Sequence, residues 1–142
     1  MMRKILIAAA MPLALAAASG AAAAPGAARA TLSGGAEVPG PGDADGGGTA
    51  EVTVAEGANT VCYTLRVEKI ATPTAAHIHR GAAGVAGPPV VTLAPPTAGT
   101  SDGCASAPAE VATAIRQTPE AFYVNVHNAE HPAGAIRGQL GR

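Results

Sequence analysis

The segment TVCYTLRVE, residues 60–68, decides the fold class, because apolar and polar side chains alternate along its whole length. One face carries Val61, Tyr63, Leu65 and Val67, and the other carries Cys62, Thr64, Arg66 and Glu68. A period of two is typical of a β-strand that buries one face and leaves the other toward solvent. This segment is therefore the clearest strand of the chain.

Shorter segments of the same kind lie on both sides of it, separated by turns rich in Gly and Pro. The expected strands are 31–37, 49–55, 75–80, 89–93, 122–127 and 134–140. Residues 108–117 form the one helical segment, with Pro at its start and Arg116 in its last turn. Residues 94–107 are expected to form a loop. Short strands with one short helix predict an all-β fold, an antiparallel β-sandwich.

The first thirty residues have the features of a secretory signal peptide. A basic start, Met1 to Lys4, precedes an uncharged apolar run and a series of small residues that ends at Ala30. Cleavage is expected after Ala30, with Ala24 as the alternative, and the domain would occupy 31–142. A membrane anchor fits less well, because the run is mostly alanine. The mature protein is expected to be secreted or periplasmic, without a membrane span.

Charge and composition argue against nucleic acid and anionic membranes as partners. Removal of residues 1–30 leaves six basic and ten acidic residues, a net charge of −4, which does not attract nucleic acid or anionic membranes. Aromatic residues are 2% of the chain, too few for the stacking platforms that single-stranded nucleic acid requires. We therefore expect a monomer whose partner, a protein or a small molecule, the sequence does not identify.

Two cysteines, Cys62 and Cys104, are expected to form a disulfide outside the cytoplasm. A bridge closing a loop of about 43 residues is worth roughly 4 kcal/mol in the chain-entropy model. It would lie on the polar face of 60–68 and tie down the loop at 94–107. A reactive thiol or metal ligand is the alternative, although no Cys-x-x-Cys spacing is present.

Histidines gather on the polar faces of two expected strands. In AHIH, residues 76–79, the two imidazoles share a face, and in FYVNVH, residues 122–127, the polar members share one. If the strands are neighbours, His77, His79 and His127 could bind zinc or copper(II), with water at a fourth position. Residues expected to support the ligands are Tyr123, Asn125, Arg137 and Gln139. The alternative is a hydrogen-bonded network without metal, and His131 is a weaker ligand candidate.

Other motifs give weaker evidence for a functional site. The glycines of 81–87 lack the Gly-x-Gly spacing of a phosphate-binding loop, and a tight turn is the simpler role. Asp43 and Asp45 stand in a Gly-rich loop, where solvation is expected and calcium binding is the alternative. No Gly-x-Ser-x-Gly motif or evident Ser/His/Asp set indicates a hydrolase.

The same motifs resemble those of a known family. AHIHRG at 76–81, FYVNVH at 122–127 and PAGAIRGQL at 132–140, with EVP at 37–39, resemble the CHRD domain, named after chordin. The resemblance covers about 31–140 and implies a β-sandwich of immunoglobulin-like or superoxide-dismutase-like character. It implies no established enzymatic activity. His131 stands where the family often has an aromatic residue.

Two functions follow as hypotheses. The first is a secreted binding module for a protein or small-molecule partner. The second is an extracytoplasmic copper- or zinc-binding protein that uses His77, His79 and His127. A metal-dependent enzyme of the superoxide dismutase type is a weaker third, because the later sequence shows no bridging His or zinc-site Asp arrangement.

Overall fold

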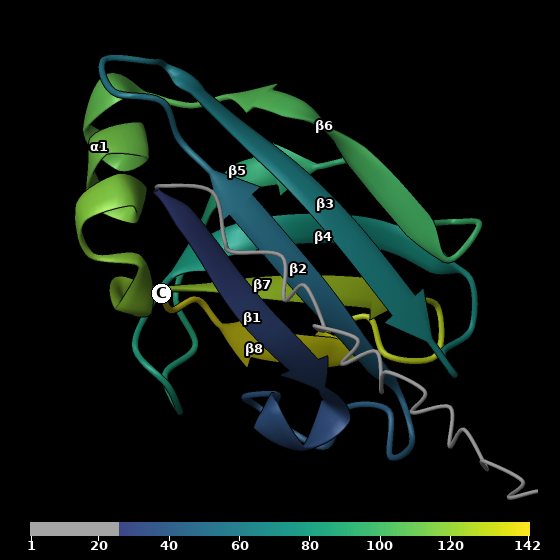
Figure 1. Cartoon of the computed structure of the whole chain (residues 1–142). Helices are drawn as coiled ribbons and strands as arrows, with labels where there is room; N and C mark the ends of the chain where they lie inside the picture. The colour runs from purple at the N-terminus through teal and green to yellow at the C-terminus, as the bar shows by residue number, and fades with distance from the viewer. Residues whose placement is uncertain (1–25) are drawn as a thin grey trace, which may run out of the picture.

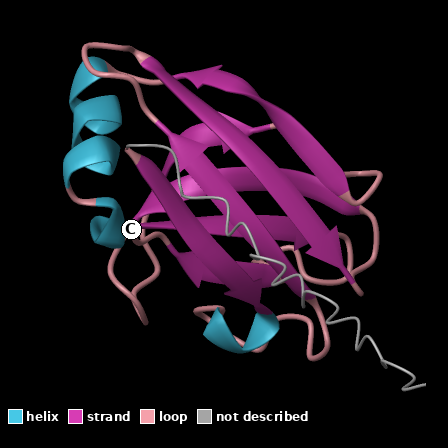
Figure 2. Ribbon diagram, in the orientation of Figure 1, coloured by secondary structure: helices cyan, strands magenta, loops and turns pink. Residues whose placement is uncertain are grey.

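The structure, a computed structural model, describes residues 26–142, and eight antiparallel strands dominate it (Figure 1). The strands are β1 (Ala27–Ser33), β2 (Gly47–Thr53), β3 (Thr60–Glu68), β4 (Pro73–Arg80), β5 (Pro89–Leu93), β6 (Thr100–Ser106), β7 (Phe122–Asn128) and β8 (Ile136–Gln139). One α-helix, α1 (Ala109–Gln117), and two single-turn 3-10 helices, η1 (Gly34–Ala36) and η2 (Pro119–Ala121), complete the fold (Figure 2). The all-β prediction with one short helix is confirmed.

The strands form one curled sheet in the order β5-β4-β7-β8-β1-β2-β3-β6. The junction between β8 and β1 is thin, since one pair, Ser33 with Arg137, and a bridge from Arg29 to Gly141 join them. The four strands on each side of this junction therefore form two layers that face each other (Figure 1). The predicted β-sandwich is therefore confirmed only in part, because its two layers belong to one nearly closed sheet.

The core lies between the two layers and follows the expected alternation. Strand β3 places Val61 and Leu65 inside with no exposed surface, and β7 does the same with Phe122, Val124 and Val126. Helix α1 closes one end of the layers with Val111, Ala112 and Ile115. The described residues contain no helix that is long and apolar enough to cross a membrane.

Strand β1 begins earlier than the sequence interpretation placed it. Ala28, Ala30 and Leu32 are buried while Arg29 and Thr31 are exposed, so the alternation of a strand already runs through the end of the expected leader. The expected strand at 31–37 is wrong beyond Ser33, where η1 follows. The basic and apolar parts of the expected signal peptide lie outside the described residues.

The expected loop at 94–107 is also wrong, because Thr100–Ser106 forms edge strand β6. The Cys62–Cys104 disulfide is confirmed, with the two residues directly opposite each other in the β3–β6 pair. The bridge therefore joins two strands on their outer face and does not tie down a loop. Sequence TSDGCAS has little strand propensity, and its pairing with β3 supplies the order that propensity lacks.

A candidate metal centre on the covered face of β4, β7 and β8

Strand order brings the two histidine segments together. Strand β4 pairs with β7 in antiparallel register, with His77 opposite Asn125 and His79 opposite Tyr123, and β7 pairs in turn with β8. The polar faces of these three strands thus form one surface, which we call the covered face. Its members are His77, His79, Tyr123, Asn125, His127, Arg137 and Gln139.

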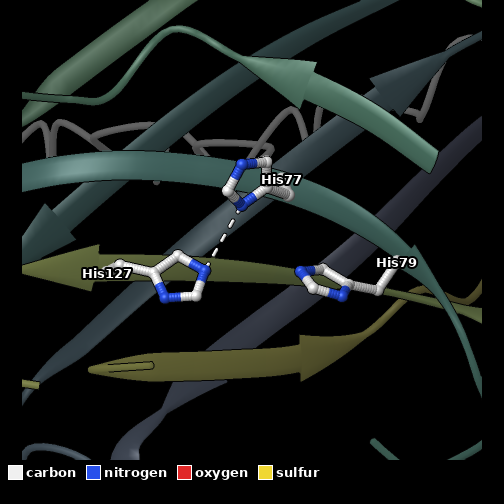
Figure 3. A group of neighbouring side chains, drawn as sticks. All are labelled: His77, His79 and His127. Carbon is white, nitrogen blue, oxygen red and sulfur yellow. Dashed lines mark hydrogen bonds between the residues drawn. The ribbon is translucent and has the colours of Figure 1, made fainter. Parts of the chain in front are cut away.

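Three histidines lie together on this face. One ring nitrogen of each of His77, His79 and His127 lies within 4.8 Å of the others, and all three rings are partly buried. Figure 3 shows the rings turned toward one another, two from β4 and one from β7. We call them the three-histidine group. The condition that the two strands are neighbours is met, and the rings of His79 and His127 lie on the same side of the fold with their centroids 6.4 Å apart.

Backbone carbonyls fix two of the imidazoles in a single tautomer. His79 Nδ1 lies 2.8 Å from the Gly87 carbonyl oxygen, and His127 Nδ1 lies 3.0 Å from that of Pro132. A carbonyl only accepts, so both Nδ1 atoms donate, and each neutral ring keeps its lone pair on Nε2. Both Nε2 atoms are therefore available as ligands on the inner side of the group.

His77 completes the group. Its Nδ1 lies 3.3 Å from His127 Nε2 and donates to that lone pair in the absence of a metal. Two nitrogens bound tetrahedrally at 2.0–2.1 Å are separated by about 3.3 Å, so this pair already has the spacing of two zinc ligands. Binding would require His77 to move its proton to Nε2 and His79 to approach by at most about 1.5 Å.

Burial favours the neutral form of two of these rings. Burial, followed by the neighbouring His127 and His79, lowers the pKa of His77. Burial also lowers the pKa of His79, against the hydrogen bond to Gly87, which favours the protonated ring, and with help from His127 and Arg137. Neutral imidazole is the form that binds metals.

Of the four expected supporting residues, Tyr123 contacts a histidine directly, and Arg137 and Gln139 bond to the neighbouring connection. The Tyr123 ring stacks on the His79 ring with centroids 4.7 Å apart and 13° between the planes. The Arg137 guanidinium carbon lies 3.3 Å from the centroid of the Tyr123 ring. Arg137 Nη2 donates to the Ala82 carbonyl at 2.9 Å, and Gln139 Nε2 donates to that of Gly81 at 2.7 Å. These side chains hold the 81–88 connection against the sheet.

That connection carries the Gly87 carbonyl, so its conformation positions His79. Tyr123 Oη accepts from the Gly87 amide at 3.1 Å and donates to its carbonyl at 3.2 Å. A Cβ on Gly87 would lie 1.7 Å from the Arg80 carbonyl oxygen, so only glycine fits there. Gly84 has a φ of 78°, which confirms a turn that needs positive φ.

Sequence reasoning missed Glu37 as part of this face. This residue, 6% exposed, follows η1, and its side chain accepts a hydrogen bond from Asn125 Nδ2. Burial raises the pKa of Glu37 to about 7, while Arg137 and the bond from Asn125 act in the opposite direction. No periodic pattern marks residue 37, and only its place in the EVP motif singled it out.

Buried polar atoms without a hydrogen-bond partner concentrate on the covered face. Among residues 26–142 these atoms are His79 Nε2, Asn125 Oδ1, Arg137 Nη1 and Gln139 Oε1. Such atoms are rare in folded proteins and call for an explanation at each place, often an ion or an ordered water. A metal held by the three-histidine group would give His79 Nε2 its missing partner.

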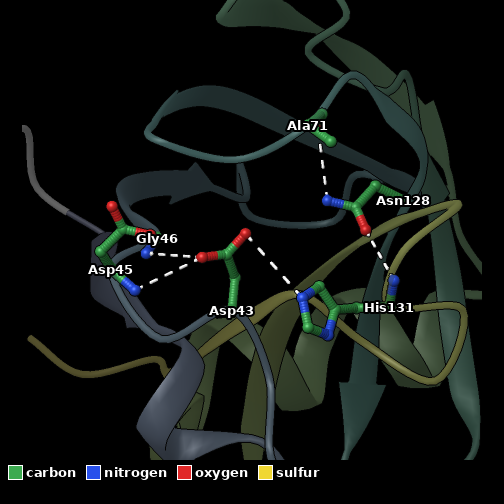
Figure 4. Close-up of polar contacts among 6 residues, drawn as sticks. All are labelled: Asp43, Asp45, Gly46, Ala71, Asn128 and His131. Carbon is green, nitrogen blue, oxygen red and sulfur yellow. Dashed lines mark hydrogen bonds and ion pairs between the residues drawn. The ribbon is translucent and has the colours of Figure 1, made fainter.

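His131, the weaker ligand candidate, lies apart from the three-histidine group. Its Nε2 faces Asp43 Oδ2 at 3.9 Å, and its backbone amide donates to Asn128 Oδ1 at 2.8 Å (Figure 4). Asp43 Oδ1 accepts the amides of Asp45 and Gly46, so this carboxylate shapes the turn of its loop. Asp45 contributes its backbone amide to this turn.

Comparison with known proteins gives one match. The CHRD domain family model matches residues 28–140, nearly the whole of the described chain. No curated protein and no solved structure matches the chain.

Proposed function

The chain belongs to the CHRD domain family, and from this premise we propose that it binds one copper or zinc ion through the three-histidine group. His77 Nδ1, His79 Nε2 and His127 Nε2 would be the ligands. The observation that carries the proposal is the state of His79. Its Nδ1 is committed to the Gly87 carbonyl, and its buried Nε2 has no partner while lying beside two other imidazoles.

The chemistry of the ligands selects the metal. Neutral imidazole suits zinc and copper, whereas calcium and magnesium prefer oxygen. Three protein ligands leave a fourth position for water or another small ligand. The carbonyls of Gly87 and Pro132 would orient the ligands from behind, as outer hydrogen bonds do in metal sites generally. The proposal concerns binding and assigns no turnover.

The location of this activity is part of the proposal. The disulfide and the family both fit an extracytoplasmic protein. We propose that a leader directs export and that it ends upstream of Ala27, because cleavage after Ala30 would remove four residues of β1 that pair with β2. Ala24, the alternative cleavage position, leaves the strand whole.

The competing hypothesis is a binding module whose covered face is only structural. It predicts that added metal changes neither the melting temperature nor the histidine ring shifts. Zinc and copper(II) are titrated separately into metal-free protein, and melting temperature and histidine ¹⁵N shifts are followed. We expect one of the two metals to raise the melting temperature. Zinc should shift the ring nitrogens of all three histidines, whereas copper(II), which is paramagnetic, should broaden their signals. Mild acid should release the ion, because an imidazole must be neutral to bind a metal.

Three variants and one control test the assignment. His77→Ala, His79→Ala and His127→Ala should each weaken binding at this group at least tenfold. His131→Ala removes the same side chain four residues from His127 and should leave the shifts of the three rings intact. Unchanged ring shifts and melting temperature in the unsubstituted protein would reject the proposal and leave the hydrogen-bonded network as the role of these residues.

A further inference from the structure

A second set of ligand-type side chains lies between two connections of the sheet. Asp43 belongs to the β1–β2 connection, and Glu130 and His131 belong to the β7–β8 connection. One ligand atom of each lies within 4.8 Å of the others. We call these residues the Asp43 group. They share no residue with the three-histidine group, so a ligand bound here would occupy a separate site.

The Asp43 carboxylate is held with one oxygen free. Oδ1 accepts the amides of Asp45 and Gly46 at 3.3 and 3.1 Å, and Oδ2 is turned to His131 (Figure 4). The Asp43 side chain is only 13% exposed. Within residues 26–142 no lysine or arginine forms an ion pair with it. This carboxylate is therefore mostly buried without a permanent counter-charge.

The backbone of His131 is fixed beside that oxygen. Its amide donates to Asn128 Oδ1, and Asn128, 1% exposed, donates in turn to the Ala71 carbonyl at 3.3 Å. The imidazole is 27% exposed, and its Nε2 stands 3.9 Å from Asp43 Oδ2. That separation is too long for a hydrogen bond, yet an ion about 2.1 Å from each atom spans up to about 4.2 Å.

We propose that Asp43 Oδ2, a Glu130 carboxylate oxygen and His131 Nε2 bind a second divalent cation, zinc. One imidazole with two carboxylates is a zinc ligand set, and the imidazole disfavours calcium and magnesium. The two carboxylates supply the charge that a dication neutralises. Glu130 is exposed and must order its side chain on binding, so this site is weaker than the three-histidine group.

The test removes the first site and titrates zinc alone. The double variant His77→Ala/His79→Ala leaves one imidazole of the three-histidine group and spares His127, whose ring holds the Pro132 carbonyl beside His131. Calorimetry should find one zinc ion per chain in this background. Adding Asp43→Asn, which keeps an oxygen for the turn, or His131→Ala should each weaken binding at least tenfold.

Asp45→Asn is the matched control, since it removes the same charge two residues away from Asp43 and should change zinc affinity less than twofold. Circular dichroism establishes that every variant is folded, and His131→Ala decides the matter if Asp43→Asn disturbs the turn. Any one of three results would overturn the proposal. They are no zinc binding in the double variant at millimolar zinc, an affinity for calcium equal to that for zinc, and unchanged zinc affinity after His131→Ala.

Discussion

The outer faces of the two layers follow one sequence pattern and have different environments. On β1, β2 and β3 the outward side chains include exposed Thr31, Thr49 and Thr64, and Arg29 pairs with Glu51 in solvent. On β4, β7 and β8 the outward Tyr123, Asn125 and Arg137 are buried. The connections at 34–46 and 81–88 cover the second face, and the polar atoms without partners are found there.

This difference shows that the alternation of apolar and polar residues predicts which side chains point away from the core. It does not predict whether solvent or another part of the protein surrounds them. A polar side chain on an open face is solvated and costs little to change. The same side chain under a covering loop must find protein partners or a ligand. The candidate metal centre lies where polar side chains are outward and covered at once.

The largest expected effect comes from the open layer, where the disulfide joins β3 to edge strand β6. Replacing both Cys62 and Cys104 by alanine should lower the free energy of unfolding by about 2–4 kcal/mol, because the unfolded chain gains loop entropy. Urea denaturation measures this. The histidine ring shifts on metal addition should stay as in the unsubstituted protein, and their loss would show that the two layers are coupled.

Substituting one arginine on each face compares the two faces directly. Arg137→Ala removes a buried guanidinium beside Tyr123 and Glu37 and should cost about 2–4 kcal/mol. Arg29→Ala removes a side chain that is 52% exposed and should cost less than about 1 kcal/mol. Denaturation of both variants under one set of conditions tests the contrast. Equal costs would mean that the covering loops do not change the environment of outward side chains.

The pH dependence of stability tests the environment of Glu37 on the covered face. Its raised pKa means that the folded state holds a proton that the unfolded state has lost between about pH 4.5 and 7. This carboxyl therefore lowers stability as pH rises through that window, and the loss is complete above pH 7. Glu37→Gln should remove the decline and gain up to about 3 kcal/mol at pH 8 relative to the unsubstituted protein. Its advantage should shrink toward pH 4.5, and a constant difference across this range would contradict the assignment.

The smallest expected effect concerns the start of β1. A chain beginning at Thr31 loses the pairs from Ala27 to Ala30 with β2 and should melt several degrees below one that begins at Gly26. N-terminal sequencing of exported protein should find a first residue at or before Ala27. A first residue of Thr31 with full stability would restore the boundary expected from the small-residue rule.

The sequence predicted features that depend on residues close together in the chain. It did not predict features that depend on contacts between distant segments. The bounds of β3 and β5 match the expected segments, because a period of two is a local signal. Strand β6 was missed because its Asp, Gly and Ser residues order only through pairing with β3. The shared face of His77 and His79 was local information, whereas the neighbourhood of β4 and β7 was a condition that the sequence left open. Burial of Glu37 needs a loop placed by the whole fold.

Anomalous diffraction at the zinc edge tests the central claim most directly, because it locates the ion independently of any second site. Crystals grown with one equivalent of zinc should show a peak about 2.0–2.1 Å from His77 Nδ1, His79 Nε2 and His127 Nε2, with the Gly87 and Pro132 hydrogen bonds kept. A crystal with zinc elsewhere and the His77–His127 hydrogen bond intact would contradict the claim.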